Sequence, residues 1–216
     1  RQGRPARRLN PGRAAVATTR RTTTLQVGAG MDWSQLPVPA ADGAADHLAG
    51  SVLPSVGLPA TDGRTVDLAA LAGLSVVYAY PMTGRPDQPL PDGWDAIPGA
   101  RGCTPQACAF RDHAAELVRL GVDHLFGLST QSTGYQQEAA ARLQLPFALL
   151  SDAELRLADA LGLPTLRVEG RALLKRLTLV IRDGVILRCF YPVFPPDAAP
   201  GQVIDWLAAG GARMPG

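Results

Sequence analysis

The chain has 216 residues, 46% of them hydrophobic and 19% charged, so it is long and apolar enough to bury a core and is not globally disordered. No run of eighteen apolar residues is present, which argues against a membrane-spanning helix. Three cysteines exclude a disulfide scaffold and a C-x-x-C zinc site. The formal net charge of +2 is the sum of two unlike parts of the chain, which weakens the argument for a nucleic-acid partner.

The net positive charge comes from residues 1–30, which hold seven arginines and no acidic residue. The remaining residues hold 14 basic and 19 acidic side chains, a net charge of −5, so we expect no nucleic-acid partner. Three origins stay open for the basic segment: a transit-type targeting segment, a basic arm for a polyanion, or a non-native extension before Met31. We favour a disordered or non-native extension. We predict an extension and lead-in over residues 1–45 and one domain over residues 46–212.

Regular patterns begin at Ser51. Residues 51–71 predict a hairpin that turns at Asp62-Gly63. Residues 74–81, LSVVYAYP, are apolar, β-branched and aromatic, as in a strand buried on both faces. Residues 82–102 are rich in Pro and Gly around one Trp and predict a long loop, which is either a packed surface loop or a cover over a site. A helix over 104–120 follows, because apolar side chains recur there at helical spacing.

The rest of the chain alternates strands and helices. The predicted elements are a strand at 124–129, a helix at 134–143, a strand at 147–151, a helix at 152–161 ended by Gly162, a hairpin of 176–181 and 183–193, and a helix at 200–209. Such an order predicts an α/β fold in which helices cover both faces of a mixed central sheet, preceded by an N-terminal hairpin.

Cys103 lies where the long loop meets the start of a helix. The free N–H groups and partial positive charge of a helix N-terminus favour a thiolate, and Pro105 suits the first turn because it needs no hydrogen-bond acceptor there. From this context alone, a reactive cysteine and a small buried one are equally good interpretations.

Cys108 follows five residues later, either as a core residue or as a second redox thiol. Five helical residues give about 7.5 Å of rise and roughly 140° of rotation, whereas a disulfide needs Cα atoms within about 7 Å and converging Cβ atoms. The two thiols therefore cannot bond unless the first turns of the helix unwind. Cys189, in ILRCFYPVF, is predicted to be a buried core thiol.

Several segments carry a family resemblance. The motif GCTPQACAFRD (102–112) resembles the active-site segment of the bacterioferritin-comigratory/PrxQ branch of the peroxiredoxins, in the AhpC/TSA superfamily. The segments YAYP, HLFGLSTQS, LPFALLSD and KRLTLVIRDGVI resemble, in the same order, other parts of that family, and the resemblance covers about residues 50–208. It implies a thioredoxin-like (peroxiredoxin) fold.

The resemblance also implies roles for three residues. Cys103 matches the peroxidatic cysteine, which is oxidised to a sulfenic acid by a hydroperoxide. Cys108 matches the resolving cysteine, which then forms an intramolecular disulfide that thioredoxin or a similar dithiol reduces. Arg176 matches the arginine that stabilises the thiolate and orients the peroxide; without the resemblance it would be read as a surface charge.

One departure concerns the family pattern Pro-x-x-x-Thr-x-x-Cys. Ala100 and Ala96 occupy the positions of the Thr and the Pro, and the nearest counterpart of the Pro is Pro81, which makes the loop about fifteen residues longer. We hypothesise that Thr83 folds back to supply the missing hydroxyl.

We therefore expect a thioredoxin-dependent peroxidase acting on hydrogen peroxide and organic hydroperoxides, without cofactor or metal. It is expected to be cytoplasmic, a monomer or weak homodimer, and to have no membrane partner. Two alternatives remain: a redox sensor with weak peroxidase activity, and a thiol–disulfide oxidoreductase, which the C-x-x-x-x-C spacing disfavours.

Overall fold

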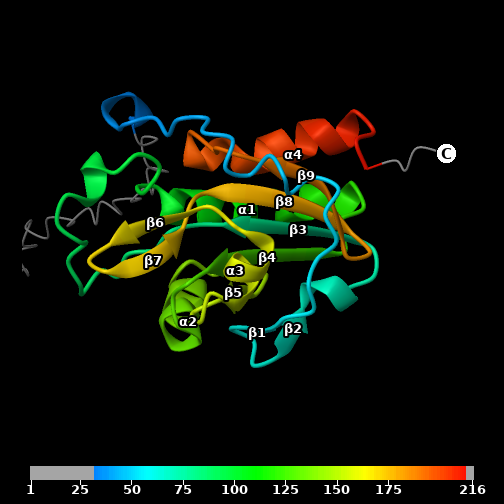
Figure 1. The fold of residues 1–216 in the computed structure, drawn as a ribbon, viewed down its shortest axis with the longest axis horizontal. Helices are drawn as coiled ribbons and strands as arrows, with labels where there is room; N and C mark the ends of the chain where they lie inside the picture. The colour runs from blue at the N-terminus through cyan, green and yellow to red at the C-terminus, as the bar shows by residue number, and fades with distance from the viewer. Residues whose placement is uncertain (1–31, 213–216) are drawn as a thin grey trace, which may run out of the picture. The chain divides into compact units, whose positions relative to one another are not determined.

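A five-stranded mixed sheet forms the centre of the computed structural model, which describes residues 32–212 (Figure 1). Its strands, in spatial order, are β5 (Leu149–Ser151), β4 (His124–Ser129), β3 (Leu74–Ala79), β8 (Leu177–Arg182) and β9 (Val185–Phe190). β3, β4 and β5 run parallel, whereas β8 is antiparallel to both β3 and β9. The central strand β3 is buried along its whole length, as its apolar sequence predicts.

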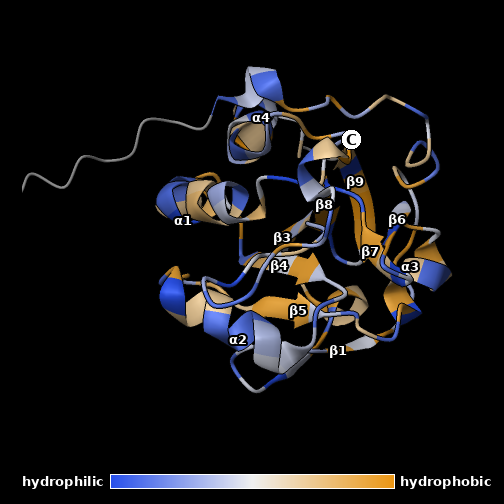
Figure 2. Ribbon diagram, turned by 90° about the vertical axis from the view of Figure 1, so that its left-hand side faces the viewer, coloured by the Kyte–Doolittle hydropathy of each residue, from blue (hydrophilic) through white to orange (hydrophobic). Residues whose placement is uncertain are grey.

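Helices cover both faces of this sheet, which confirms the predicted fold class (Figure 2). One face packs against α1 (Cys103–Arg119), α2 (Thr133–Arg142) and α4 (Ala199–Ala208). The other packs against α3 (Arg156–Leu161) and the hairpin of β1 (Gly57–Pro59) and β2 (Thr65–Asp67). Each face of the sheet carries its own hydrophobic core, and alternate residues of β3 contribute to one or the other. Val76 and Tyr78 face α1, and Val77 and Ala79 face α3.

The predicted elements are all present, with two differences. The helix predicted at 152–161 begins only at Arg156, because the Asp152 carboxylate accepts hydrogen bonds from the backbone N–H groups of Leu157 and Ala158 and so holds residues 153–155 in a turn before it. A hairpin of β6 (Thr165–Val168) and β7 (Arg171–Leu174) was not predicted. Its four-residue strands carry charged, exposed positions and give little periodic signal.

The long loop packs through a small apolar core of its own. Met82, Trp94 and Ala100 from the loop are buried against Val168 and Leu173 of the β6–β7 hairpin. Trp94 begins a short 3-10 helix and is 3% exposed, so it anchors the loop. The β6–β7 hairpin therefore supplies the apolar surface against which the long loop packs.

The lead-in before the hairpin also lies against the domain. The indole N–H of Trp33 donates to Asp197 at 3.0 Å, and its ring meets Phe194 edge-on. Lys175 pairs with Asp42 at 2.7 Å. The predictions made for residues 1–31 lie outside the described residues.

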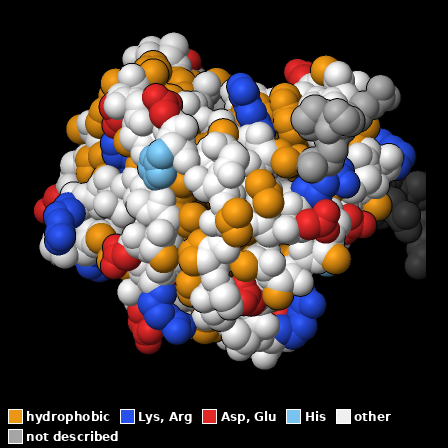
Figure 3. All heavy atoms as spheres, turned by 45° about the vertical axis from the view of Figure 1, so that its right-hand side comes forward, with side chains coloured by type: hydrophobic (Ala, Val, Ile, Leu, Met, Phe, Trp, Pro, Cys, Tyr) orange, Lys and Arg blue, Asp and Glu red, His pale blue; other side chains and the backbone are white. Residues whose placement is uncertain are grey.

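Basic and acidic side chains are interspersed with apolar ones on the face shown in Figure 3. None of the helices within residues 32–212 has the length and hydropathy that crossing a bilayer requires.

Candidate active site

Cys103 is the first residue of α1 and is 3% exposed. The preceding residue, Gly102, has a φ of 103°, a left-handed conformation that favours glycine. Packing also requires glycine at this position, because a Cβ atom there would lie 2.5 Å from Cγ of Pro196 and 2.9 Å from Cη2 of Trp33. The turn into α1 thus places the sulfur at the helix N-terminus, beneath packed side chains.

Arg176 holds the end of the loop against this sulfur. Its Nη2 lies 3.3 Å from Cys103 Sγ and donates to the carbonyl oxygens of Gly99, Ala100 and Arg101 at 3.3, 3.3 and 3.1 Å. Its Nη1 donates to Oε1 of Gln106, a fully buried side chain one turn along α1. The guanidinium therefore ties together the loop, the first turn of α1 and the thiol.

The charge of Arg176 has no carboxylate beside it. The side chain is 3% exposed, and it forms no ion pair with any Asp or Glu among residues 32–212. Its neighbours are neutral carbonyl and amide oxygens and the Cys103 sulfur. Of these neighbours only the Cys103 sulfur can ionise, and both the guanidinium and the partial positive charge of the helix N-terminus lie beside it.

Cys108 lies on α1 and is partly buried against the same core as Cys103. Both thiols are free, and α1 is continuous from Cys103 to Arg119. Arg111 faces Cys108: its pKa is raised, first by the hydrogen bond to Asp112 and to a smaller degree by the charge of Cys108. In this folded helix the two sulfurs cannot approach bonding distance.

Thr83 is buried and bonded to Gln131. Its backbone N–H and hydroxyl donate to Oε1 of Gln131 at 3.0 and 3.1 Å, and Nε2 of Gln131 donates back to the Thr83 carbonyl at 3.1 Å. No polar contact joins Thr83 to Cys103 within the described part of the chain. The role of Thr83 as the substitute hydroxyl stays a prediction. Because its hydroxyl proton is donated to Gln131, the Thr83 oxygen would have to act as an acceptor in that role.

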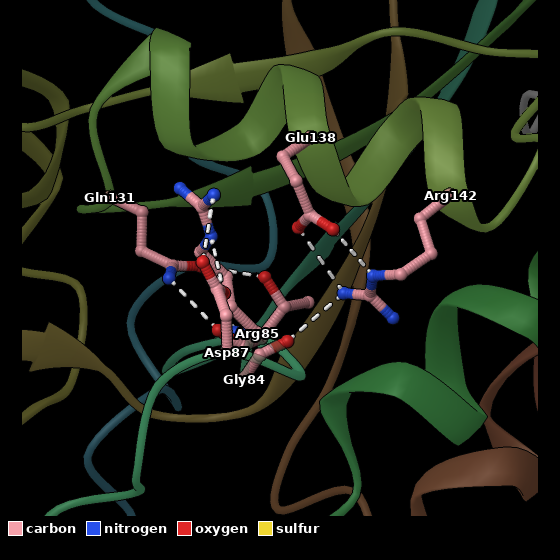
Figure 4. Close-up of polar contacts among 7 residues, drawn as sticks. Gly84, Arg85, Asp87, Gln131, Glu138 and Arg142 are labelled. Carbon is pink, nitrogen blue, oxygen red and sulfur yellow. Dashed lines mark hydrogen bonds and ion pairs between the residues drawn. The ribbon is translucent and has the colours of Figure 1, made fainter.

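The start of the long loop is also fixed to α2 (Figure 4). Arg142 donates to the carbonyl of Gly84 at 3.0 Å and pairs with Glu138 at 2.6 Å. Arg85 pairs with Asp87, both on the loop itself. The loop is thereby held at both ends, by Arg142 at its start and by Arg176 at its end.

Tyr78 and Tyr80 are buried in the same hydrophobic cluster as Cys103. Tyr78 stacks on Phe110 with ring centroids 4.4 Å apart, and Tyr80 lies beside Tyr78. Burial raises the pKa of both phenols, so they stay neutral at physiological pH. Neither tyrosine was singled out from the sequence, nor was Gln106, although Gln106 lies inside the GCTPQAC motif, three residues after Cys103.

The third cysteine, Cys189, lies in β9 and is partly buried against the core, where the sequence predicts full burial; this burial raises the pKa of its thiol to about 12. It therefore stays protonated and unreactive at neutral pH. No group of three or more His, Cys, Asp or Glu side chains suited to a metal ion occurs among residues 32–212.

Comparisons with known proteins agree with this geometry. The model of the Redoxin family matches residues 48–203. Peroxiredoxin Q of Triticum aestivum chloroplasts is 30% identical over 156 residues, covering 72% of this chain and 64% of that protein. Peroxiredoxin Bcp of Escherichia coli is 36% identical over 115 residues, covering 53% of this chain and 64% of that protein. The matched region thus spans slightly less than two thirds of both relatives.

Solved structures show the same fold. Peroxidoxin BcpB from Mycobacterium tuberculosis superposes with a TM-score of 0.61 at 26% identity, covering 77% of this chain and 98% of that one. A PrxQ mutant from Xylella fastidiosa superposes with a TM-score of 0.60 at 18% identity, covering 75% of this chain and 96% of that one.

Proposed function

This chain belongs to the Redoxin family, in its branch of PrxQ- and Bcp-like peroxiredoxins, and from that premise we propose that it is a thiol peroxidase. The observation that carries the proposal is the Cys103 sulfur at the start of α1, 3.3 Å from a buried arginine that pairs with no carboxylate of residues 32–212. A thiolate in such a place is a nucleophile held next to a fixed donor of hydrogen bonds.

In the first step, the Cys103 thiolate attacks the terminal oxygen of a hydroperoxide and the O–O bond breaks. Sulfur is oxidised to a sulfenic acid, and the peroxide is reduced to an alkoxide or hydroxide, which takes a proton from water and leaves as alcohol or water. The guanidinium of Arg176 donates to the oxygen that gains negative charge as the bond breaks.

In the second step, the Cys108 thiol condenses with the sulfenic acid, forming the disulfide and releasing water. The first turn of α1 must unwind for this, which breaks the first backbone hydrogen bond of the helix, from Gln106 N to Gly102 O at 3.0 Å. A thioredoxin-like dithiol then reduces the disulfide by exchange and is itself oxidised.

The substrates we propose are hydrogen peroxide and organic hydroperoxides. The reductant, the monomeric or weakly dimeric state and a cytoplasmic location are proposals from the same resemblance. The long loop, fixed by Arg142 and Arg176, is proposed to narrow access to Cys103.

The test is peroxide consumption with thioredoxin and its reductase by wild type and by three Cys→Ser variants. Cys103→Ser should abolish turnover. Cys108→Ser should consume one equivalent of peroxide and then stop, with a sulfenic acid on Cys103 detectable by mass spectrometry. Cys189→Ser is the matched control, because that thiol lies on β9 and its raised pKa keeps it protonated, and it should turn over like wild type. Turnover by Cys103→Ser would refute the assignment.

One observation favours a second function, a redox sensor with slow peroxide chemistry. Ala100 stands where the related peroxiredoxins carry a hydroxyl, and Thr83 donates its hydroxyl to Gln131 instead. A sensor would form the disulfide once with peroxide but would recycle poorly with thioredoxin. Reduction of insulin disulfides without peroxide consumption would instead indicate a thiol–disulfide oxidoreductase.

A further inference from the structure

A cavity of about 300 Å³ lies between the lead-in and the end of the long loop. Pro39 and Ala40 of the lead-in form one wall, and residues 97–99 of the loop form another. Arg176 also lines it. The two chain segments touch here, since a Cβ atom at Gly99 would lie 3.5 Å from the Pro39 ring.

The cavity borders directly on the groups that hold the reactive sulfur. Gly99 and Arg176 both line it, and Arg176 Nη2 donates to the Gly99 carbonyl at 3.3 Å. The same Nη2 lies 3.3 Å from Cys103 Sγ. Arg176 therefore lines the cavity and contacts the sulfur with the same side chain.

The lining suits an uncharged apolar group. Ile97 and Leu166 contribute aliphatic side chains, and Tyr191 contributes an aromatic ring. The two charged side chains besides Arg176, Asp42 and Lys175, neutralise each other across 2.7 Å. The hydrogen bond from Lys175 lowers the pKa of Asp42 to about 2, so the two side chains stay ionised and paired at neutral pH, and the guanidinium of Arg176 is the one uncompensated charge of the lining.

The size of the cavity sets the size of its ligand. At about 30 Å³ for each water-sized group, the cavity holds roughly ten non-hydrogen atoms, near the lower end of small-molecule sites. This is the bulk of one aryl group or a short alkyl chain. Hydrogen peroxide has no organic group and therefore would not fill the cavity.

The walls belong to parts of the chain outside the common family core. Pro39 and Ala40 precede residue 48, where the match to the Redoxin family begins, and Ile97 lies in the lengthened loop. We propose that this cavity binds the organic group of a neutral aryl or alkyl hydroperoxide and holds its O–OH end at Arg176, so that the lead-in and the long loop set substrate preference. This inference rests on the proposed peroxidase activity and deepens it.

The experiment compares the second-order rate constants of oxidation by cumene hydroperoxide and by hydrogen peroxide. Ala40 is exposed and lines the cavity, so Ala40→Phe fills the cavity without disturbing a core. Ala41 is its exposed neighbour outside the lining, so Ala41→Phe is the matched control. We expect Ala40→Phe to lower the ratio of the two rate constants at least fivefold, and Ala41→Phe to keep the wild-type ratio.

A second measurement uses 2-phenyl-2-propanol, the alcohol formed from cumene hydroperoxide, as an unreactive ligand. It should compete with cumene hydroperoxide in wild type and lose that effect in Ala40→Phe. A wild-type ratio in Ala40→Phe, together with no inhibition by the alcohol at millimolar concentration, would overturn the cavity proposal while leaving the peroxidase intact. A wild-type protein that reacts with neither peroxide would overturn both.

Discussion

Replacing Arg176 tests the proposed chemistry most directly, because this one guanidinium contacts the Cys103 sulfur and carries the nearest positive charge. Arg176→Met keeps a long apolar stem but removes the charge and every donor. Arg176→Lys keeps the charge and loses the planar fork, which at present reaches three loop carbonyls, Gln106 and the sulfur together.

The expected magnitude follows from the contact. A unit charge 3.3 Å from a thiolate interacts by about 5 kcal/mol at an effective dielectric constant of roughly 20. Hydrogen bonds to charged groups contribute a net of about 1.5–3 kcal/mol, because solvent offsets part of that attraction. At about 1.4 kcal/mol for each factor of ten, Arg176→Met should slow the reaction with hydrogen peroxide about ten- to 150-fold. The rate constant of Arg176→Lys should lie between those of Arg176→Met and wild type.

Stopped-flow tryptophan fluorescence can follow the reaction, since the Trp33 ring lies next to Gly102. The matched control is Arg188→Met, which removes an exposed arginine on β9. It should react within twofold of wild type. Circular dichroism melts define a temperature at which all variants are folded. A rate for Arg176→Met within twofold of wild type, or one faster than that of Arg176→Lys, would refute the reasoning.

Three further outcomes are expected. Thr83→Val should slow the reaction with hydrogen peroxide at least fivefold if this hydroxyl substitutes for the one absent at Ala100, and wild-type turnover would exclude that role. Trp94→Ala should lower the free energy of unfolding in urea by about 3–5 kcal/mol, because it leaves a cavity in the buried cluster of the loop; a loss below about 1 kcal/mol would show that the loop is independent of the domain. Burial raises the pKa of Cys189 from 9.0 to about 12, so the unfolded chain loses this proton first and stability should fall as the pH rises above 9. Urea unfolding at pH 8 and 10 should show a steeper loss for wild type than for Cys189→Ala, and parallel losses would contradict the assignment.

Much of the fold could be predicted from local pattern. The buried run of β3, the spacing of apolar residues along α1 and the turn at Asp62-Gly63 are signals carried by neighbouring residues, and the structure confirms the corresponding elements. The β6–β7 hairpin was missed because its short strands are stabilised by the long loop packed against them, a partner far away in the sequence.

Local sequence pattern was enough to predict where two of the cysteines lie. The motif GCTPQAC places Cys103 at a helix start and Cys108 on the same helix, because both positions follow from local helix signals and from the family resemblance. The groups around the Cys103 sulfur, by contrast, are brought together by long-range packing. Arg176 lies 73 residues away in sequence, yet β8 pairs with β3 and brings its guanidinium to 3.3 Å from Sγ. The lead-in likewise reaches the loop only through packing, since no local pattern records a contact between Pro39 and Gly99. Burial, charge pairing and the walls of the cavity are set by residues distant in sequence, which is why folding had to bring them together before they could be assigned.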